Sequence, residues 1–117
     1  MHTPTYFTLA ALLDGPLHGY AIIKRAETLS EGWVHMTAGT LYGALERLSR
    51  EGLVVEDRQE IVGGRARRYY RLTESGHAAL DAEATRMQRA AAVIDNSSRA
   101  KLTAGSSRIA LPEPRPV

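Results

Sequence analysis

The sequence predicts a mainly α-helical fold that carries one small β-hairpin. Three observations support this fold class. Apolar residues recur every three or four positions over residues 4–13, 18–30 and 37–52, which is the spacing of one helix face. From residue 53 the pattern becomes β-rich, and a Gly-Gly pair at 63–64 divides this run into two strands. Helical spacing returns after residue 73, so the predicted order is three helices, a hairpin and a last helix.

The composition fits one small domain with an appendage, since the chain has 117 residues. Charged residues make up 24% and hydrophobic residues 44%, which is typical of a soluble globular protein. The formal net charge is +2 and the pI is near 9.2. This excess is small, so only a local cluster of charge can indicate a nucleic-acid partner.

Several classes of protein and site are excluded by what the chain lacks. Without cysteine there are no disulfides and no thiolate metal sites, and the four histidines share no ligand spacing. No Ser/His/Asp spacing suggests catalysis, so we expect no enzymatic activity, no metal and no cofactor. No apolar run approaches the length of a membrane span, and the N-terminus carries no export signal. The expected location is therefore the cytoplasm.

The third predicted helix, residues 37–52, has two contrasting faces. Thr37 is placed to cap its N-terminus, and Gly52 to end it in a left-handed conformation. The apolar face consists of Leu41, Leu45 and Leu48. The opposite face is small, polar and basic and consists of Gly43, Arg47 and Arg50. Taken alone, this pattern also fits an ordinary amphipathic surface helix.

The predicted hairpin is strongly basic. Residues 58–71 contain five arginines and a single acid, Glu60. The five are Arg58, Arg65, Arg67, Arg68 and Arg71. A planar guanidinium suits paired contacts with phosphate oxygens. A charged hairpin also serves to resist edge-to-edge aggregation, but its position directly after a capped, polar helix favours DNA binding.

The last predicted helix carries a heptad pattern, with apolar residues at intervals of 4, 3, 4 and 3. These residues are Leu80, Ala84, Met87, Ala91 and Ile94. We interpret them as the seam of a homodimer in which the two helices approach closely at alanine. The predicted domains are residues 1–76 for DNA binding, 77–102 for dimerisation and 103–117 as a disordered tail. Trp33, the single tryptophan, is predicted to seal the edge of the core rather than to bind a ligand.

Helix, helix, helix, hairpin is the order of a winged helix-turn-helix, in which the third helix recognises DNA and the hairpin is the wing. In this interpretation Thr37 and the first helical amides hold a phosphate, and Thr40 and Tyr42 reach base edges. The wing arginines clamp the backbone or enter the minor groove. The full set of candidate DNA-binding residues is Tyr20, Lys24, Thr37, Gly39, Thr40, Tyr42, Gly43, Arg47, Arg65, Arg67 and Arg68.

Three spans of the chain resemble the PadR family of bacterial transcriptional regulators: LLDGPLHGYAIIKR, TAGTLYGALERLSREGLV and GGRARRYYRLTESG. The resemblance covers most of residues 12–76. It implies a dimeric winged-helix repressor that binds double-stranded DNA at a pseudo-palindromic operator and is released by a small molecule or another signal. It also implies that the C-terminal helix makes the dimer, as in short-form members with a single such helix.

The chain departs from the family pattern at two places. Gly43 stands where the family usually has proline, and glycine leaves the second turn of that helix more flexible. The last helix has no tryptophan, so the sequence does not predict the aromatic platform that holds flat ligands in some members. The alternative function from another class is a winged-helix module for protein interaction, whose binding would not weaken steeply with salt.

Overall fold

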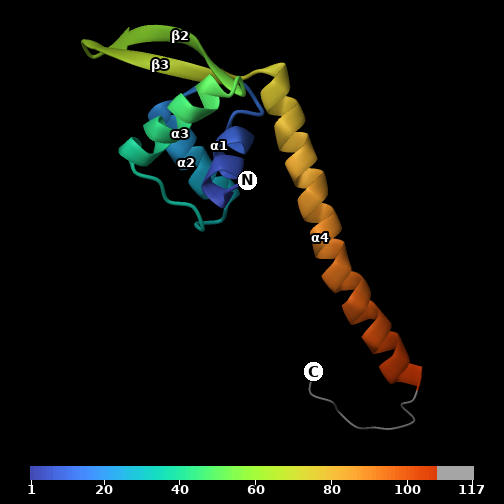
Figure 1. Cartoon of the computed structure of the whole chain (residues 1–117). Helices are drawn as coiled ribbons and strands as arrows, with labels where there is room; N and C mark the ends of the chain where they lie inside the picture. Colours follow the sequence, from blue (N-terminus) through green and yellow to red (C-terminus); the bar gives the residue numbers. More distant parts are fainter. Residues whose placement is uncertain (108–117) are drawn as a thin grey trace. The chain divides into compact units, whose positions relative to one another are not determined.

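The computed structural model describes the fold of residues 1–107, and the predicted fold class is confirmed (Figure 1). Its elements, in chain order, are α1 (Thr3–Ala11), β1 (Leu17–His18), α2 (Gly19–Leu29), α3 (Ala38–Arg50), β2 (Val54–Val62), β3 (Arg65–Leu72) and α4 (Glu74–Ser107). The chain forms two compact units, and the first comprises Met1–Glu83. The second unit begins at Ala84 and contains the rest of α4.

Three helices enclose the core of the first unit. The three leucines predicted for the apolar face of α3 are buried, because their spacing of four and three residues places them on one stripe. They pack with Leu9 of α1 and Ile22 of α2, both completely buried. This confirms that α3 is anchored on one side and leaves its other side to solvent.

The strands form one antiparallel sheet in the order β1-β3-β2. Gly63 and Gly64 join β2 to β3 with φ angles of 60° and 79°. A two-residue turn with two positive φ angles favours glycine and matches the twist of the strands, so pairing continues to the Val62–Arg65 pair. Figure 1 shows this hairpin as a long arm that ends in the turn. The two-residue strand β1, too short to show an alternating pattern, was not predicted.

Trp33 does not seal the core, and the prediction that it does is wrong. Its side chain is 84% exposed. After α2 the chain turns through Glu31 and then continues extended, with Val34 and Met36 buried on one side. Because side chains alternate in extended backbone, Trp33 and His35 point to the opposite side, into solvent.

The start of α4 is fixed by Thr73 to the loop that precedes β2. Its hydroxyl accepts a hydrogen bond from the backbone N–H of Gly76 at 3.0 Å, which is the contact of an N-cap, and donates to the carbonyl of Gly52 at 2.6 Å. Gly76 lies so close to the backbone of Leu53 that a Cβ there would collide with the Leu53 carbonyl oxygen. Leu80, one turn later, is 3% exposed.

Leu80 therefore belongs to the core of the first unit, which corrects its assignment to the dimer seam. The same burial explains why the first compact unit reaches Glu83 rather than ending at the predicted boundary of 76. Periodicity shows that a helix face is apolar, but it does not show what covers that face.

Beyond this point α4 continues as one helix to Ser107, past the predicted boundary at 102. Residues 103–107 contain no proline, so no backbone N–H is missing there and the helical hydrogen bonds can continue. The rest of the predicted tail, residues 108–117, lies outside the described residues. Met87 is 37% exposed and Ile94 67% exposed. Within the part of the chain that the structure describes, no helix is long and apolar enough to cross a membrane.

Candidate nucleic-acid interface

The N-terminus of α3 is capped by its own side chains and faces solvent. The backbone N–H of Thr40 donates to the Thr37 hydroxyl at 3.2 Å, and this hydroxyl is 3.0 Å from that of Thr40. Gly39 and Gly43 are exposed, and a Cβ at either would meet open space. The leading turns of α3 thus present a smooth surface of hydroxyls and backbone, which is open to the close approach of another molecule.

Arg47 does not share this open surface, which corrects its predicted position on the exposed face. Its side chain is half-buried, and its guanidinium donates to the hydroxyl of Thr5 in α1 at 2.9 Å. The long side chain extends from α3 toward α1, and its hydrogen bond links the two helices. Arg50 pairs with Glu46 one turn away, at 3.0 Å.

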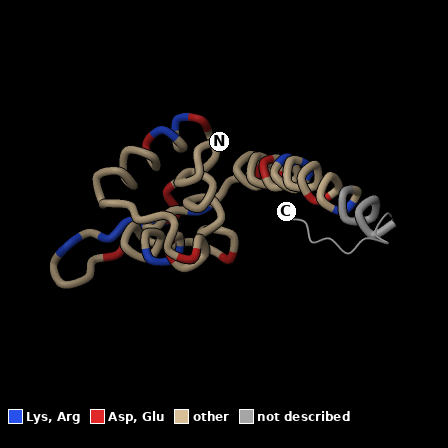
Figure 2. The backbone as a smooth tube through the Cα atoms, turned by 90° about the horizontal axis from the view of Figure 1, so that it is seen from below, with Lys and Arg blue, Asp and Glu red and all other residues tan. Residues whose placement is uncertain are grey.

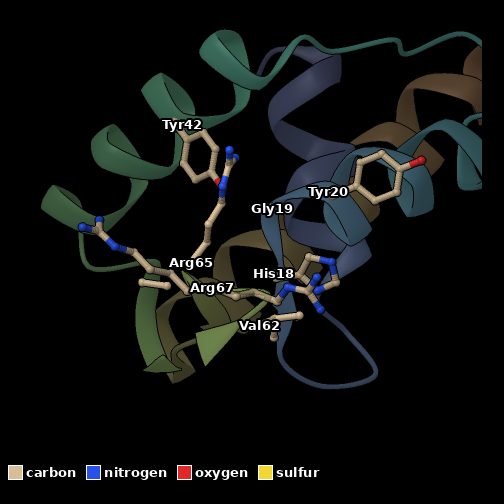
Figure 3. Close-up of a pocket in the computed structure, with 9 residues that line it drawn as sticks. His18, Gly19, Tyr20, Tyr42, Val62, Arg65 and Arg67 are labelled. Atoms are coloured by element: carbon tan, nitrogen blue, oxygen red, sulfur yellow. The ribbon is translucent and has the colours of Figure 1, made fainter. Parts of the chain in front are cut away.

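A hollow of about 480 Å³ lies between the start of α2, Tyr42 of α3 and the outer half of the hairpin. Its lining consists of His18, Gly19, Tyr20, Tyr42, Val62, Arg65, Ala66, Arg67 and Arg68. Figure 3 shows the Tyr42 ring pointing into this space from α3, while Tyr20 projects outward and is 67% exposed. The Tyr42 hydroxyl lies against Gly19, where any Cβ would collide with it. Glycine at 19 therefore leaves room for the Tyr42 hydroxyl beside the first turn of α2.

The side of the hairpin near its base is electrically balanced. The guanidinium of Arg58 lies over the ring of Tyr69, 3.9 Å from its centroid, and pairs with Asp57 and Glu60 at 3.2 and 3.3 Å. Hydrogen bonds from Tyr69 and then Arg58 lower the pKa of the Glu60 carboxyl. Arg71 pairs with Asp57 at 3.3 Å. Arg58 and Arg71 are thus matched by carboxylates.

Glu56 and Asp57 come just before residues 58–71, the range whose charges were counted in the sequence. The hairpin therefore carries less free positive charge than that range suggests. A β-bulge between Glu56 and Arg58 adds one residue on this strand. The carboxylate of Glu56 lies 3.8 Å from Arg68. The sequence signal was therefore present, in two acids that come just before the arginines.

Uncompensated positive charge remains near the turn. Arg65 and Arg67 form no ion pair among the residues that the structure describes. Figure 2 shows the run of Lys and Arg positions along this arm. Partial burial, and then the nearby charge of Arg67, lower the pKa of His18. His18 is therefore neutral near pH 7 and leaves the charge of the hollow to the arginines.

The structure thus brings together five of the predicted site residues, Tyr20, Tyr42, Arg65, Arg67 and Arg68, around one hollow. Thr37, Gly39, Thr40 and Gly43 lie exposed on α3, outside its lining. Lys24 borders a second hollow of about 430 Å³ beside Tyr20 and β1. Four residues of the lining, His18, Gly19, Val62 and Ala66, were not among the candidates predicted from the sequence. For Gly19 and His18 the adjoining His-Gly-Tyr run was the available signal.

Comparison with known proteins identifies the family of this chain. The model of the "Transcriptional regulator PadR-like family" matches residues 8–82. A transcriptional regulator of Mycobacterium tuberculosis (strain ATCC 25618 / H37Rv) is 43% identical over 67 residues, which cover 57% of this chain and 59% of that protein. The chain therefore spans less than two thirds of the length of this relative.

Solved structures share the fold. Bacillus subtilis PadR in complex with operator DNA has a TM-score of 0.61 at 27% identity, over 68% of this chain and 45% of that chain. A PadR family transcriptional regulator from Eggerthella lenta has a TM-score of 0.66 at 26% identity, over 80% of each chain. Since the family model covers more than half of the sequence, the chain belongs to the PadR-like family of transcriptional regulators.

Proposed function

We propose that this protein is a sequence-specific DNA-binding repressor that binds a pseudo-palindromic operator as a homodimer. The observation that carries the proposal is the pairing of two surfaces in the first unit. One is the open, capped N-terminal half of α3, and the other is the outer hairpin with its unpaired arginines. The relative from Bacillus subtilis binds operator DNA with the same fold. The family is one of regulators rather than enzymes.

Each surface suits one part of a DNA duplex. A helix of this motif enters the major groove with its N-terminal residues toward the bases, and here those residues are Thr37, Gly39 and Thr40. Glycines at 39 and 43 allow the helix to lie close to the groove wall. Arg65 and Arg67 meet the phosphates beside it, since neither is held in an ion pair by a carboxylate of the described residues. Tyr20 and Lys24 are exposed on α2 and add backbone contacts.

The dimer is proposed to form through the later turns of α4. Ala84, Met87, Ala91 and Ile94 share one face of this helix, and exposure rises along it to 67% at Ile94. An apolar stripe of that kind favours a partner helix. Release by a small molecule or another signal is part of the same proposal. Residues 74–107 contain no Trp, Tyr or Phe, so such a ligand would not be held by aromatic stacking on α4.

Selection of bound duplexes from a random pool, repeated over a range of salt concentrations, tests this function. We expect a two-fold symmetric consensus, and an affinity that falls steeply as salt rises because counterions are released from the phosphates. A protein-interaction module would select no consensus and would show little salt dependence. Either of those two results would refute the proposed function.

A further inference from the structure

The turn end of the hairpin combines exposed apolar residues with arginine, and residues 61–67 contain no acid. Ile61 is 73% exposed and Val62 42% exposed, at the end of an edge strand. The nearest acid, Glu60, is engaged by Arg58 and by the hydroxyl of Tyr69. Single exposed apolar residues are common on proteins. Two adjoining ones beside unpaired arginines, at the end of a paired arm, are a more specific arrangement.

The register of the hairpin decides which way Ile61 faces. Ile61 pairs with Ala66, and Gln59 pairs with Arg68. Residues directly opposite one another, and residues two apart on a strand, share a face of the sheet. Ile61 therefore lies on the same face as Ala66 and Arg68, both of which line the hollow with Tyr42. By the same rule Val62, Arg65 and Arg67 lie on the opposite face, and they line the hollow as well. The turn end of the hairpin therefore carries Ile61 on one face and the two unpaired arginines on the other.

From this geometry we propose that Ile61 is an apolar contact in the minor groove and a determinant of sequence preference beside the major-groove site. The inference rests on the proposed function and deepens it. With α3 in the major groove, the arm meets the adjacent minor groove. Proteins that bind that groove combine arginine, which favours a narrow A·T-rich groove, with apolar wedges that press on base steps. The end of this hairpin supplies Ile61 as the wedge and Arg65 and Arg67 as the cations.

The apolar nature of Ile61 excludes a role as a phosphate contact. An aliphatic side chain gains nothing from a phosphate, whereas it gains from the sugar walls and base edges of the groove, where water is displaced. Arg65 and Arg67 hold the neighbouring phosphates and bring the side chain to the groove. The β2–β3 pairing reaches the turn itself, so the arm does not have to become ordered before it makes this contact.

The test compares Ile61→Ser with Val55→Ser, a matched change of an exposed β-branched residue at the other end of the same strand. Each protein is titrated on the selected operator and on versions whose flanking A·T pairs are replaced by G·C or by inosine·C. Inosine·C has the minor groove of A·T but the major groove of G·C, so it isolates minor-groove reading. Wild type is expected to prefer A·T and inosine·C equally over G·C.

Ile61→Ser should abolish this flank preference and weaken operator affinity about tenfold, since the isoleucine no longer buries apolar surface in the groove, while the salt slope stays unchanged. Val55→Ser should behave as wild type. Equal flank preference in Ile61→Ser and wild type would overturn the inference even though the proposed function stands. The inference would also be overturned if Ile61→Ser kept the flank preference but sedimented as a different oligomer. That result would mean that the turn end of the hairpin contacts protein. Failure of the wild type to select any DNA would reject the function and the inference together.

Discussion

Replacing Gly76 with alanine is expected to lower the free energy of unfolding by about 2 kcal/mol or more. The new Cβ would collide with the backbone carbonyl oxygen of Leu53 and would lie 2.9 Å from its carbonyl carbon. Backbone is not displaced as easily as the end of a side chain, so overpacking here costs about 3 kcal/mol. Alanine returns only about 1 kcal/mol through its better helix propensity, and the net change is destabilising.

Gly43→Ala is the matched control, because it is the same change inside another helix. A Cβ at Gly43 meets nothing within 4 Å. Only the propensity gain remains, so this variant should be more stable by up to about 1 kcal/mol. Urea unfolding of both variants and of wild type measures whether each substitution raises or lowers the free energy of unfolding. Equal stability of Gly76→Ala and wild type would show that α4 does not lie this close to the start of β2.

Breaking the proposed dimer should have the largest effect on DNA binding. Ala91→Glu combined with Ile94→Glu places two carboxylates on the apolar face of α4, where a partner helix would have to bury them unpaired. We expect monomers by sedimentation and a fall in operator affinity of about 100-fold or more, because the two half-sites are then bound separately. Affinity for a single half-site should change little.

Ala92→Glu combined with Val93→Glu adds the same charge to other faces of the same helix turn. Val93 is 65% exposed, almost as much as Ile94, so it serves as a matched aliphatic position outside the proposed seam. This control should remain dimeric and bind the operator as wild type does. A dimeric Ala91→Glu, Ile94→Glu protein would place the dimer contact elsewhere on the chain.

Local signals in the sequence predicted most of the fold. The leucine spacing of α3, the Thr37 cap and the Gly-Gly turn each act over a few residues, and each is found as predicted. The failures all involve contacts between distant segments. Arg47 is drawn to Thr5, and no periodicity in α3 could identify that partner. Leu80 follows the same heptad as Ile94, yet one is buried in the core and the other exposed.

The sequence predicted the elements that form the candidate site, but not how their side chains are arranged. The basic hairpin and the polar helix were evident from composition, and most of the residues from them that line the hollow were among those named. Their charges could not be assigned from sequence, because the bulge at Glu56–Arg58 decides which arginines meet carboxylates. That Tyr42 lies against Gly19 depends on how α2 and α3 pack. Whether these residues contact DNA stays a prediction.

In the proposed complex α3 reads the bases of the major groove while the arginines of the hairpin hold the phosphates, and this division of roles is the central claim. It is tested by titrating Arg67→Ala and Thr40→Val against operator and random duplexes across a salt series, with Arg71→Ala as the control for an arginine already paired with Asp57. Thr40→Val removes a hydroxyl but keeps the backbone N–H that Thr37 caps.

Arg67→Ala should flatten the log–log salt slope by about 0.9 on both duplexes and preserve the preference for the operator, while Arg71→Ala leaves the slope near that of wild type. Thr40→Val should keep the slope and weaken operator binding by about 1–3 kcal/mol through the missing hydrogen bond to a base, with little change on random DNA. If Arg67→Ala instead abolishes the preference with its slope intact, and Thr40→Val flattens the slope with its preference intact, the hairpin reads the sequence and the proposed division of roles is contradicted.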